Sequence, residues 1–323
     1  MRPLPASLVA ILATSLGGCG DADLAAPPVA ARAGALRSSR PGMGAVYYGS
    51  GTMFRVWAPS ADQVFVAGDW NGWSASANQL DADGNGHFSA DVEGARPGQQ
   101  YKFVIRRGGD TLWRADPRAR RMVNSAGASV IVDPDAYRFG DGGYGTPPFQ
   151  EQIIYELHVG TFVGTAGGGH GTWQSAMSRL DHLAQLGVNM IELLPVAEFP
   201  GDRSAGYNPA YPFAPESAYG TPEDMKRFVD EAHRRGIGVI LDVVHNHYGP
   251  NDISMWCFDG DCLGAGGAYF YTDWRRETGW GPRPDYGRQP VRDFIRDNTR
   301  QWLHDYHIDG LRWDSTFSIR AEG

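Results

Sequence analysis

The sequence is poor in lysine and cysteine, and its N-terminal apolar stretch is short. Two of its 29 basic residues are lysine, Lys102 and Lys226, which we attribute to a composition bias without functional meaning. Acidic residues number 37, so the net charge is −8. This charge argues against a nucleic-acid partner, because such proteins concentrate basic residues on one face. The 42% hydrophobic content is typical of a globular protein with real cores.

The apolar stretch Leu8–Leu16 is too short to span a bilayer as a helix. It leads into Leu-Gly-Gly-Cys19, which resembles a bacterial lipobox, a signal that is cleaved before an acylated cysteine. We therefore expect residues 1–19 to be a lipoprotein signal peptide, with Cys19 as the lipidation site. The protein would be exported to the periplasm or cell surface and would touch the membrane only through this lipid. An ordinary signal peptide with an unmodified Cys19 is the alternative.

Residues 20–44, rich in Ala, Pro, Arg and Ser, are expected to form a flexible tether. Export also bears on the other two cysteines, in Cys257-Phe-Asp-Gly-Asp-Cys262. In an oxidising compartment this pair predicts a small disulfide between Cys257 and Cys262. A metal site is disfavoured there, because no second cysteine pair is present.

Residues 45–137 carry signals for strands and turns only. Apolar runs such as Thr52–Trp57 and Gln63–Ala67 end at Gly or Pro and recur at nearly regular spacing. This pattern predicts a small antiparallel, immunoglobulin-like β-sandwich. The run Asp81–Gly86 looks like the opening of a calcium loop, but its twelfth position is Val92 where a glutamate is needed. We therefore expect a hairpin turn there.

Residues 138–150 are rich in Gly and Pro and predict a linker, and after them the pattern changes to alternating strands and helices. The apolar run Ile153–Leu157 predicts a buried strand, and further strands are expected at Val188–Leu194, Gly238–Val244 and Ile308–Trp313. The expected helices are Thr172–Leu186, Thr221–Arg235 and Val291–Tyr306. Such alternation predicts parallel βαβ units of the α/β class, in an open sheet or a (β/α)8 barrel. The glycine run 167–171 lacks the lysine of a phosphate-binding loop. Polar residues follow the strand ends, where barrel active sites form, so residues 151–323 predict the first four units of a TIM barrel.

The third and fourth strands end in chemically suggestive residues. The third leads from Asp242 to His247, and the fourth ends in Arg312-Trp313-Asp314. Strand residues two apart share a face, so Arg312 and Asp314 point the same way. A guanidinium beside a carboxylate keeps it ionised, which suits a nucleophile that attacks an anomeric carbon. A buried salt bridge without a catalytic role is the alternative.

Together, in this order and spacing, the two motifs resemble the first and second conserved regions of the alpha-amylase superfamily, glycoside hydrolase family 13. Further matching segments are Tyr155–Phe162, Ile191–Pro195 and Gly206–Pro209 in the barrel half, and Phe54–Pro59 and Val64–Trp73 in the sandwich. The sandwich resembles the N-terminal module of glycogen branching enzymes and their relatives. In such a module, Trp70 or Trp73 would either contact glucan or serve only in packing within the protein.

By position in these motifs, the resemblance implies that Asp314 is the catalytic nucleophile and Arg312 orients it. It implies substrate contacts by Asp242, by His247 through a sugar hydroxyl, and by Tyr207 through stacking on the reacting glucose.

The residue next to His247 bears on metal binding. Asn246 corresponds to a calcium ligand of true amylases. Branching enzymes generally lack that site, so no metal and no cofactor are expected.

The reaction implied is double displacement with retention on an α-1,4-glucan, that is starch, glycogen or maltooligosaccharide. A branching-enzyme-like protein is the leading hypothesis, and a maltooligosyltrehalose trehalohydrolase is the nearest alternative. An exported alpha-amylase or debranching enzyme comes third. A non-catalytic, glucan-binding surface lipoprotein is the alternative from a different class.

The general acid of such enzymes lies on the fifth barrel strand and a third acid follows the seventh, whereas this sequence stops at Gly323. Glu192, Glu198 and Glu322 match no acid of the family. We therefore expect a truncated chain that is inactive alone, with a dimerising half-barrel as the alternative. The segment Ser315–Ile319 has no histidine four residues after Asp314. Branching enzymes also lack that histidine, so this feature favours the branching-enzyme hypothesis.

Overall fold

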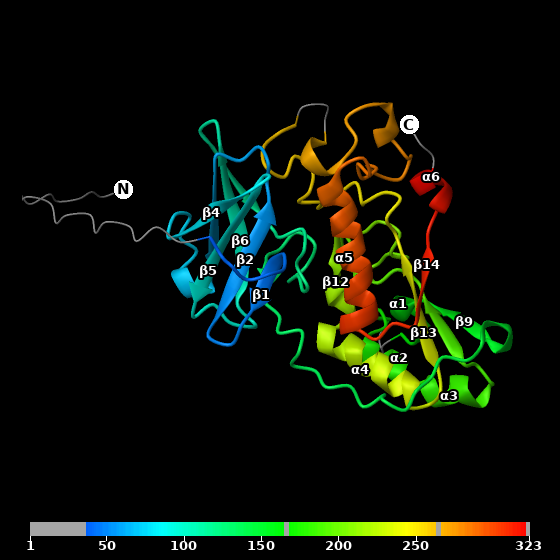
Figure 1. The fold of residues 1–323 in the computed structure, drawn as a ribbon. Coiled ribbons are helices and arrows are strands. Elements are labelled where there is room, and N and C mark those ends of the chain that lie inside the picture. Colours follow the sequence, from blue (N-terminus) through cyan, green and yellow to red (C-terminus); the bar gives the residue numbers. More distant parts are fainter. Residues whose placement is uncertain (1–36, 165–167, 263–265, 321–323) are drawn as a thin grey trace, which may run out of the picture. The chain divides into compact units, whose positions relative to one another are not determined.

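The computed structural model describes residues 37–164, 168–262 and 266–320 (Figure 1). The expected signal peptide, Cys19 and Glu322 lie outside these ranges. None of the helices within the ranges is long and apolar enough to cross a membrane.

Eight strands build the N-terminal sandwich. They are β1 Gly44–Tyr47, β2 Gly51–Trp57, β3 Gln63–Gly68, β4 Asn78–Gly84, β5 His87–Glu93, β6 Gln100–Arg107, β7 Asp110–Arg114 and β8 Ser129–Val130. They follow the order β1-β2-β5-β4-β3-β6-β7, with β8 on β6, and every pairing is antiparallel. Alternating apolar residues such as Phe54, Val66 and Phe103 are fully buried between the layers. The expected β-sandwich is confirmed.

The turn between β4 and β5 explains the calcium-like motif. Gly84, Asn85 and Gly86 adopt φ values of 89°, 52° and 77°. This left-handed backbone suits Gly and Asn, which are common in tight hairpin turns. The run is a hairpin, as expected.

The prediction of a flexible tether over residues 20–44 is wrong for its last part, from Ser38 onward. Ser38 donates its backbone N–H to Ser89 Oγ (3.0 Å) and its hydroxyl to Asp91 Oδ1 (2.6 Å). Arg55 on β2 donates to the carbonyl oxygens of Ser38, Arg40 and Gly42. The segment from Ser38 is therefore held on the sandwich by polar contacts that a composition argument could not reveal.

The C-terminal half is an α/β layer. Its parallel strands are β9 Ile154–Leu157, β10 Met190–Leu193, β13 Gly238–Val243 and β14 Gly310–Trp313. Its helices are α1 Val159–Phe162, α2 Trp173–Met177, α3 Leu180–Gln185, α4 Pro222–His233, α5 Gln289–Asp305 and α6 Thr316–Arg320, and a hairpin is formed by β11 Ala197–Glu198 and β12 Tyr211–Pro215. The sheet order is β14-β13-β10-β9, so each strand lies beside the next one in sequence.

Two expectations about this half need correction. The strand over Ile153–Leu157 was expected to be buried, but Ile154 is 45% and Tyr155 36% exposed. β9 is an edge strand of the sheet, so one of its sides is open within the described ranges. The single helix expected over Thr172–Leu186 is two helices, because Arg179 leaves the helical backbone region (φ −113°, ψ 3°).

Helix α4 follows its sequence signals closely. Thr221 Oγ1 accepts the backbone N–H of Asp224 (3.2 Å), and Pro222 occupies the first turn. Both features stabilise a helix start. The helix ends at His233, two residues before the expected end, and Gly236 follows with φ 72°.

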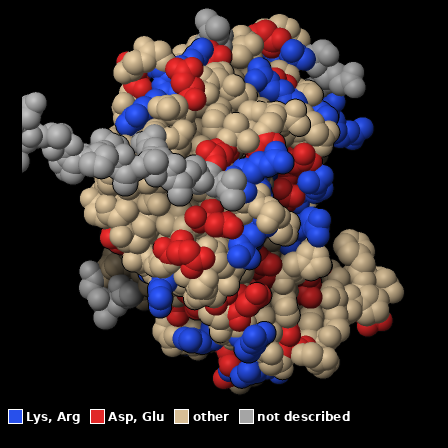
Figure 2. All heavy atoms as spheres, turned by 60° about the vertical axis from the view of Figure 1, so that its left-hand side comes forward, with Lys and Arg blue, Asp and Glu red and all other residues tan. Residues whose placement is uncertain are grey.

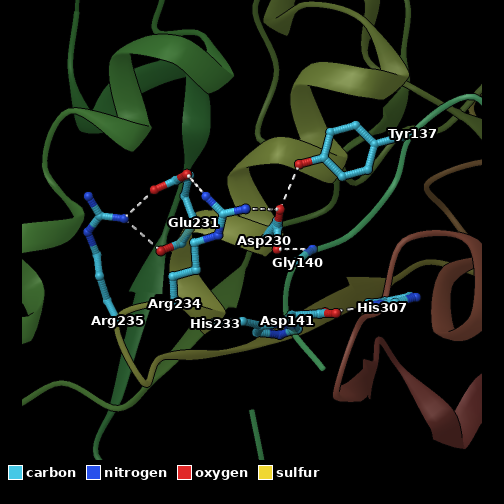
Figure 3. Close-up of polar contacts among 9 residues, drawn as sticks. All are labelled: Tyr137, Gly140, Asp141, Asp230, Glu231, His233, Arg234, Arg235 and His307. Atoms are coloured by element: carbon cyan, nitrogen blue, oxygen red, sulfur yellow. Dashed lines mark hydrogen bonds and ion pairs between the residues drawn. The ribbon is translucent and has the colours of Figure 1, made fainter. Parts of the chain in front are cut away.

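The expected linker is held firmly against α4 (Figure 3). Gly140 N–H donates to Asp230 Oδ1 (3.0 Å). Asp141 Oδ2 lies 2.8 Å from His233 Nδ1 and 2.7 Å from His307 Nδ1. Burial alone would raise the pKa of Asp141, but the bonds from His307 and His233 lower it. This carboxylate therefore ties the linker to the end of α4 and to the residues before β14.

The sandwich and the α/β layer share contacts through the segment around residues 257–262. Arg114 donates to the carbonyl oxygens of Phe258 and Cys257, both at 3.0 Å. Cys257 and Cys262 form a disulfide, with their Cα atoms 4.9 Å apart. Arg118 also pairs with Asp297 on α5 (2.8 Å). The sandwich is thus packed onto the same body as the site described below.

Two buried carboxyl groups face each other at the β11–β12 hairpin. Glu198 and Glu216 are both fully buried. Each carboxyl group accepts the backbone N–H of the residue that follows the other glutamate. Ser217 N–H donates to Glu198 Oε2 (2.7 Å), and Phe199 N–H donates to Glu216 Oε2 (3.0 Å). Burial, reinforced by Glu216, raises the pKa of Glu198 from 4.5 to about 8, and burial raises the pKa of Glu216 to about 7. Glu198 therefore stays largely protonated at neutral pH, whereas Glu216 is only partly protonated.

This pair predicts that stability falls as pH rises. A carboxyl group with a raised pKa binds its proton more tightly in the folded state, so this contribution is complete below about pH 4.5 and is lost towards about pH 8. Glu198→Gln removes the titration of Glu198 and keeps a side chain of similar size, while Glu216 still titrates. We expect urea melts to show a flatter pH profile, with the variant more stable than the parent by about 1–2 kcal/mol at pH 8.5. Glu151→Gln, at an exposed position, is the control; equal profiles for the three proteins would contradict the assignment.

Candidate functional site

The site forms where β13 and β14 end side by side. Asp242 and Arg312 are direct partners across this strand pair. Arg312 Nη1 donates to Asp242 Oδ1 (3.0 Å) and Oδ2 (2.8 Å), and also to Asp314 Oδ1 (2.8 Å). One guanidinium nitrogen thus bridges two carboxylates, and the side chains expected to share a face do meet.

The two carboxylates have different surroundings. The Asp242 side chain is 2% exposed, whereas that of Asp314 is 19% and that of Arg312 43% exposed. Burial raises the pKa of Asp242, although the hydrogen bonds from Tyr207 and Arg312 oppose this. Burial would lower the pKa of Arg312, but its bond and attraction to Asp242 outweigh that and raise it. Asp242 is therefore the buried anchor, and Asp314 is the carboxylate that a ligand could reach.

Tyr207 is brought to the anchor by a loop that passes close to the end of β10. Its hydroxyl donates to Asp242 Oδ2 (2.6 Å). The preceding Gly206 has φ 90°, and a Cβ there would lie 2.0 Å from the carbonyl oxygen of Pro195. Only glycine permits this approach. Burial and the bond to Asp242 both raise the pKa of Tyr207, so its hydroxyl remains a donor at neutral pH.

Asn246 and His247 complete the polar cluster. Asn246 Nδ2 donates to Asp314 Oδ2 (3.1 Å), so both oxygens of Asp314 accept a hydrogen bond. His247 Nδ1 lies 2.9 Å from Asn246 Oδ1, and its Nε2 lies 2.8 Å from the Tyr207 carbonyl oxygen. Burial lowers the pKa of His247. Both of its ring nitrogens face protein oxygens, so the expected contact with a sugar hydroxyl would require one of these bonds to open.

The tryptophans singled out in the sandwich differ in their surroundings. Trp70 stacks on Phe54 with ring centroids 5.2 Å apart, and its Nε1 donates to Asn78 Oδ1 (3.1 Å). Trp73 lies beside Trp113, with centroids 6.4 Å apart, and Trp113 is 41% exposed. Packing explains Trp70, whereas the Trp73–Trp113 pair lies nearer the surface.

Sequence reasoning missed one aromatic neighbour of the site. The Trp280 ring lies 6.0 Å from the His247 ring and is 59% exposed. Trp280 stands in a loop without regular structure, so periodicity gave no signal. Its Gly-Trp-Gly-Pro context was a turn signal that could have singled it out.

No group of three or more His, Cys, Asp or Glu side chains within the described ranges is arranged to hold a metal ion. The Asn246 amide is engaged by Asp314 and His247. Figure 2 shows acidic and basic side chains interspersed over one face of the molecule. That face carries no uniformly basic area of the kind nucleic acids require.

Comparison with known families gives two matches. Residues 42–119 match carbohydrate-binding module 48, the isoamylase N-terminal domain. Residues 156–257 match the alpha amylase catalytic domain. The resemblance to the alpha-amylase superfamily, found from the motifs, is confirmed.

Similar curated proteins are longer than this chain. A 1,4-alpha-glucan branching enzyme of Salinibacter ruber is 37% identical over 86% of the chain and 46% of its own length. A malto-oligosyltrehalose trehalohydrolase of Deinococcus radiodurans is 36% identical over 83% of the chain and 41% of its own length. The chain thus spans less than half the length of these relatives.

Among solved structures, a Salmonella typhimurium protein described as an alpha amylase superposes with a TM-score of 0.74 at 36% identity, covering 87% of this chain and 45% of that one. The catalytic module of the glycogen-degrading pneumococcal protein SpuA has a TM-score of 0.73 at 24% identity, covering 87% and 48%. The first shares fold and sequence, and the second shows the fold alone.

The buried anchor predicts a pH-dependent cost for losing Arg312. In Arg312→Ala, Asp242 remains buried without its cation, although the partly exposed position admits some water. We expect the free energy of unfolding to fall by about 2 kcal/mol at pH 7.5. The deficit should shrink towards pH 4, because Asp242 then takes up a proton. Arg275→Ala, which breaks a surface pair with Asp273, should change chemical melts little. A deficit independent of pH would contradict the assignment.

Proposed function

We propose that this chain, which resembles carbohydrate-binding module 48 and then an alpha-amylase catalytic domain, supplies the nucleophile side of an α-glucan-active, retaining enzyme. The observation that carries the proposal is Asp314, a partly exposed carboxylate whose two oxygens are held by Arg312 and Asn246. A carboxylate oriented in this way suits attack on an anomeric carbon.

In the proposed mechanism, Asp314 attacks the anomeric carbon of a bound glucose unit. The bond to the leaving oxygen breaks as that oxygen takes a proton from a second carboxyl group, and a glucosyl ester on Asp314 results. An acceptor hydroxyl then attacks the ester while the second carboxylate removes its proton. We assign no described residue to that second group. Asp242 is unsuited to it, because Arg312 and Tyr207 occupy both of its oxygens.

We propose that the acceptor is another glucan hydroxyl, which makes the reaction branching. The support is the 37% identity to a protein named as a 1,4-alpha-glucan branching enzyme. Release of trehalose from maltooligosyltrehalose is the second candidate, supported by 36% identity to a trehalohydrolase.

Incubation of the full-length protein with amylose tests this proposal. Branching should lower the iodine colour without new reducing ends, whereas hydrolysis raises the number of reducing ends. Free trehalose from maltooligosyltrehalose would favour the second candidate. Asp314→Asn should lower the rate by at least about 1,000-fold, and the exposed control Asp273→Asn should not. Full activity of Asp314→Asn would contradict the assignment of Asp314 as the nucleophile.

We further propose that β9, β10, β13 and β14 are the first four strands of a (β/α)8 barrel. The support is their parallel order and the location of Asp242 and Arg312–Asp314 at their C-terminal ends, where barrel active sites lie.

We also propose export with a lipid on Cys19, supported by the lipobox-like Leu-Gly-Gly-Cys. A lipid with two acyl chains confers strong membrane affinity. In a bacterial host, the parent should partition into the detergent phase of Triton X-114, and Cys19→Ala into the aqueous phase. Detergent partitioning by both proteins would contradict a lipid on this residue.

A further inference from the structure

Trp280 is an exposed ring on a tightly braced turn. Thr278 Oγ1 accepts the backbone N–H groups of Trp280 (3.3 Å) and Gly281 (3.2 Å) and donates to the Gly281 carbonyl oxygen (2.7 Å). Glu277 and Pro282 pair across the base of the turn as an isolated β-bridge. The backbone that presents the ring is therefore fixed before any ligand arrives.

The same turn packs closely against the chain segment next to His247. A Cβ on Gly281 would lie 1.9 Å from the Tyr248 carbonyl oxygen, so only glycine fits. Tyr248 N–H in turn donates to the Pro282 carbonyl oxygen (3.0 Å). Tyr248 directly follows His247, whose ring lies 6.0 Å from that of Trp280. The position of Trp280 is thus coupled to the strand end that carries the site.

Trp280 also lines a hollow of about 790 Å³. This volume falls within the usual range of ligand sites. Further aromatic and polar residues that line it are Tyr211, Trp256, Trp113, Asp252, Glu277 and Lys102. Flat rings suit the apolar faces of sugar units, and the mixture of two acids with one lysine suits hydroxyl groups better than a strongly charged ligand.

Rigid presentation also matters for affinity. An exposed tryptophan contributes most to binding when it loses little conformational freedom on contact. Trp274 offers a comparison within the same segment of the chain. It is more exposed, at 75%, but it does not line the hollow. Exposure alone therefore does not single out Trp280; its location between the site and the hollow does.

We propose that Trp280 is a glucan-stacking residue, over which an α-1,4-glucan chain held at Asp314 continues into this hollow. The inference rests on the proposed function and adds a binding residue that sets the preference for longer chains. Trp280 itself takes no part in bond cleavage.

Maltoheptaose binding to the full-length protein tests the inference, in a parent that carries Asp314→Asn so that the ligand is not consumed. By calorimetric titration, Trp280→Ala should weaken binding about tenfold, as expected for loss of one aromatic contact. Trp280→Phe keeps a ring and should recover most of the affinity. Trp274→Ala is the matched control and should bind as the parent does. An affinity of Trp280→Ala within twofold of the parent would overturn the inference.

A measurement without substitution at Trp280 guards against a misfolded variant. N-bromosuccinimide oxidises exposed tryptophans, and mass spectrometry locates the products. Saturating maltoheptaose should protect Trp280 and leave Trp274 reactive; equal oxidation of both would overturn the inference. If the protein still converts amylose in that case, the proposed function stands. If it neither binds nor converts any α-glucan, the proposed function fails as well.

Discussion

The ion pair between Arg312 and Asp242 across β13 and β14 determines the arrangement of the candidate site. A carboxylate that is 2% exposed is costly unless a cation and hydrogen-bond donors compensate for the lost water. Parallel pairing places Arg312 directly opposite Asp242, which meets this need without a loop. The same nitrogen then holds Asp314, so the strand register that buries the anchor also positions the reachable carboxylate.

The loops around this pair are located by backbone contacts. Gly206 lies against the Pro195 carbonyl oxygen and Gly281 against that of Tyr248. Each glycine is followed or preceded by an aromatic residue, Tyr207 or Trp280, whose ring is thereby carried to the site. Because a side chain at either glycine would collide with backbone, these rings depend on chain geometry as much as on their own packing.

Much of this arrangement could be predicted from residue patterns, and the limits are physical. Apolar runs located the parallel strands, and spacing of two residues placed Arg312 and Asp314 on one face. The pattern could not show that Arg312 is shared with Asp242, because that contact depends on register between strands 70 residues apart. The pattern also missed the location of Trp280 near the site and the hydrogen bonds that hold Ser38 on the sandwich. Both depend on loop contacts, which have no periodicity. The exposure of β9 escaped notice because an apolar run does not reveal whether a neighbouring strand covers it.

The charge of the cluster favours the reaction class proposed for it. Two carboxylates share one guanidinium, so Asp242, Asp314 and Arg312 together carry one net negative charge when all are ionised. His247 adds no compensating positive charge, because burial lowers its pKa. The transition state of glycoside cleavage develops positive charge at the anomeric carbon. A fixed, partly dehydrated site with a net negative charge stabilises such a species more than the neutral sugar, which is the difference that accelerates a reaction.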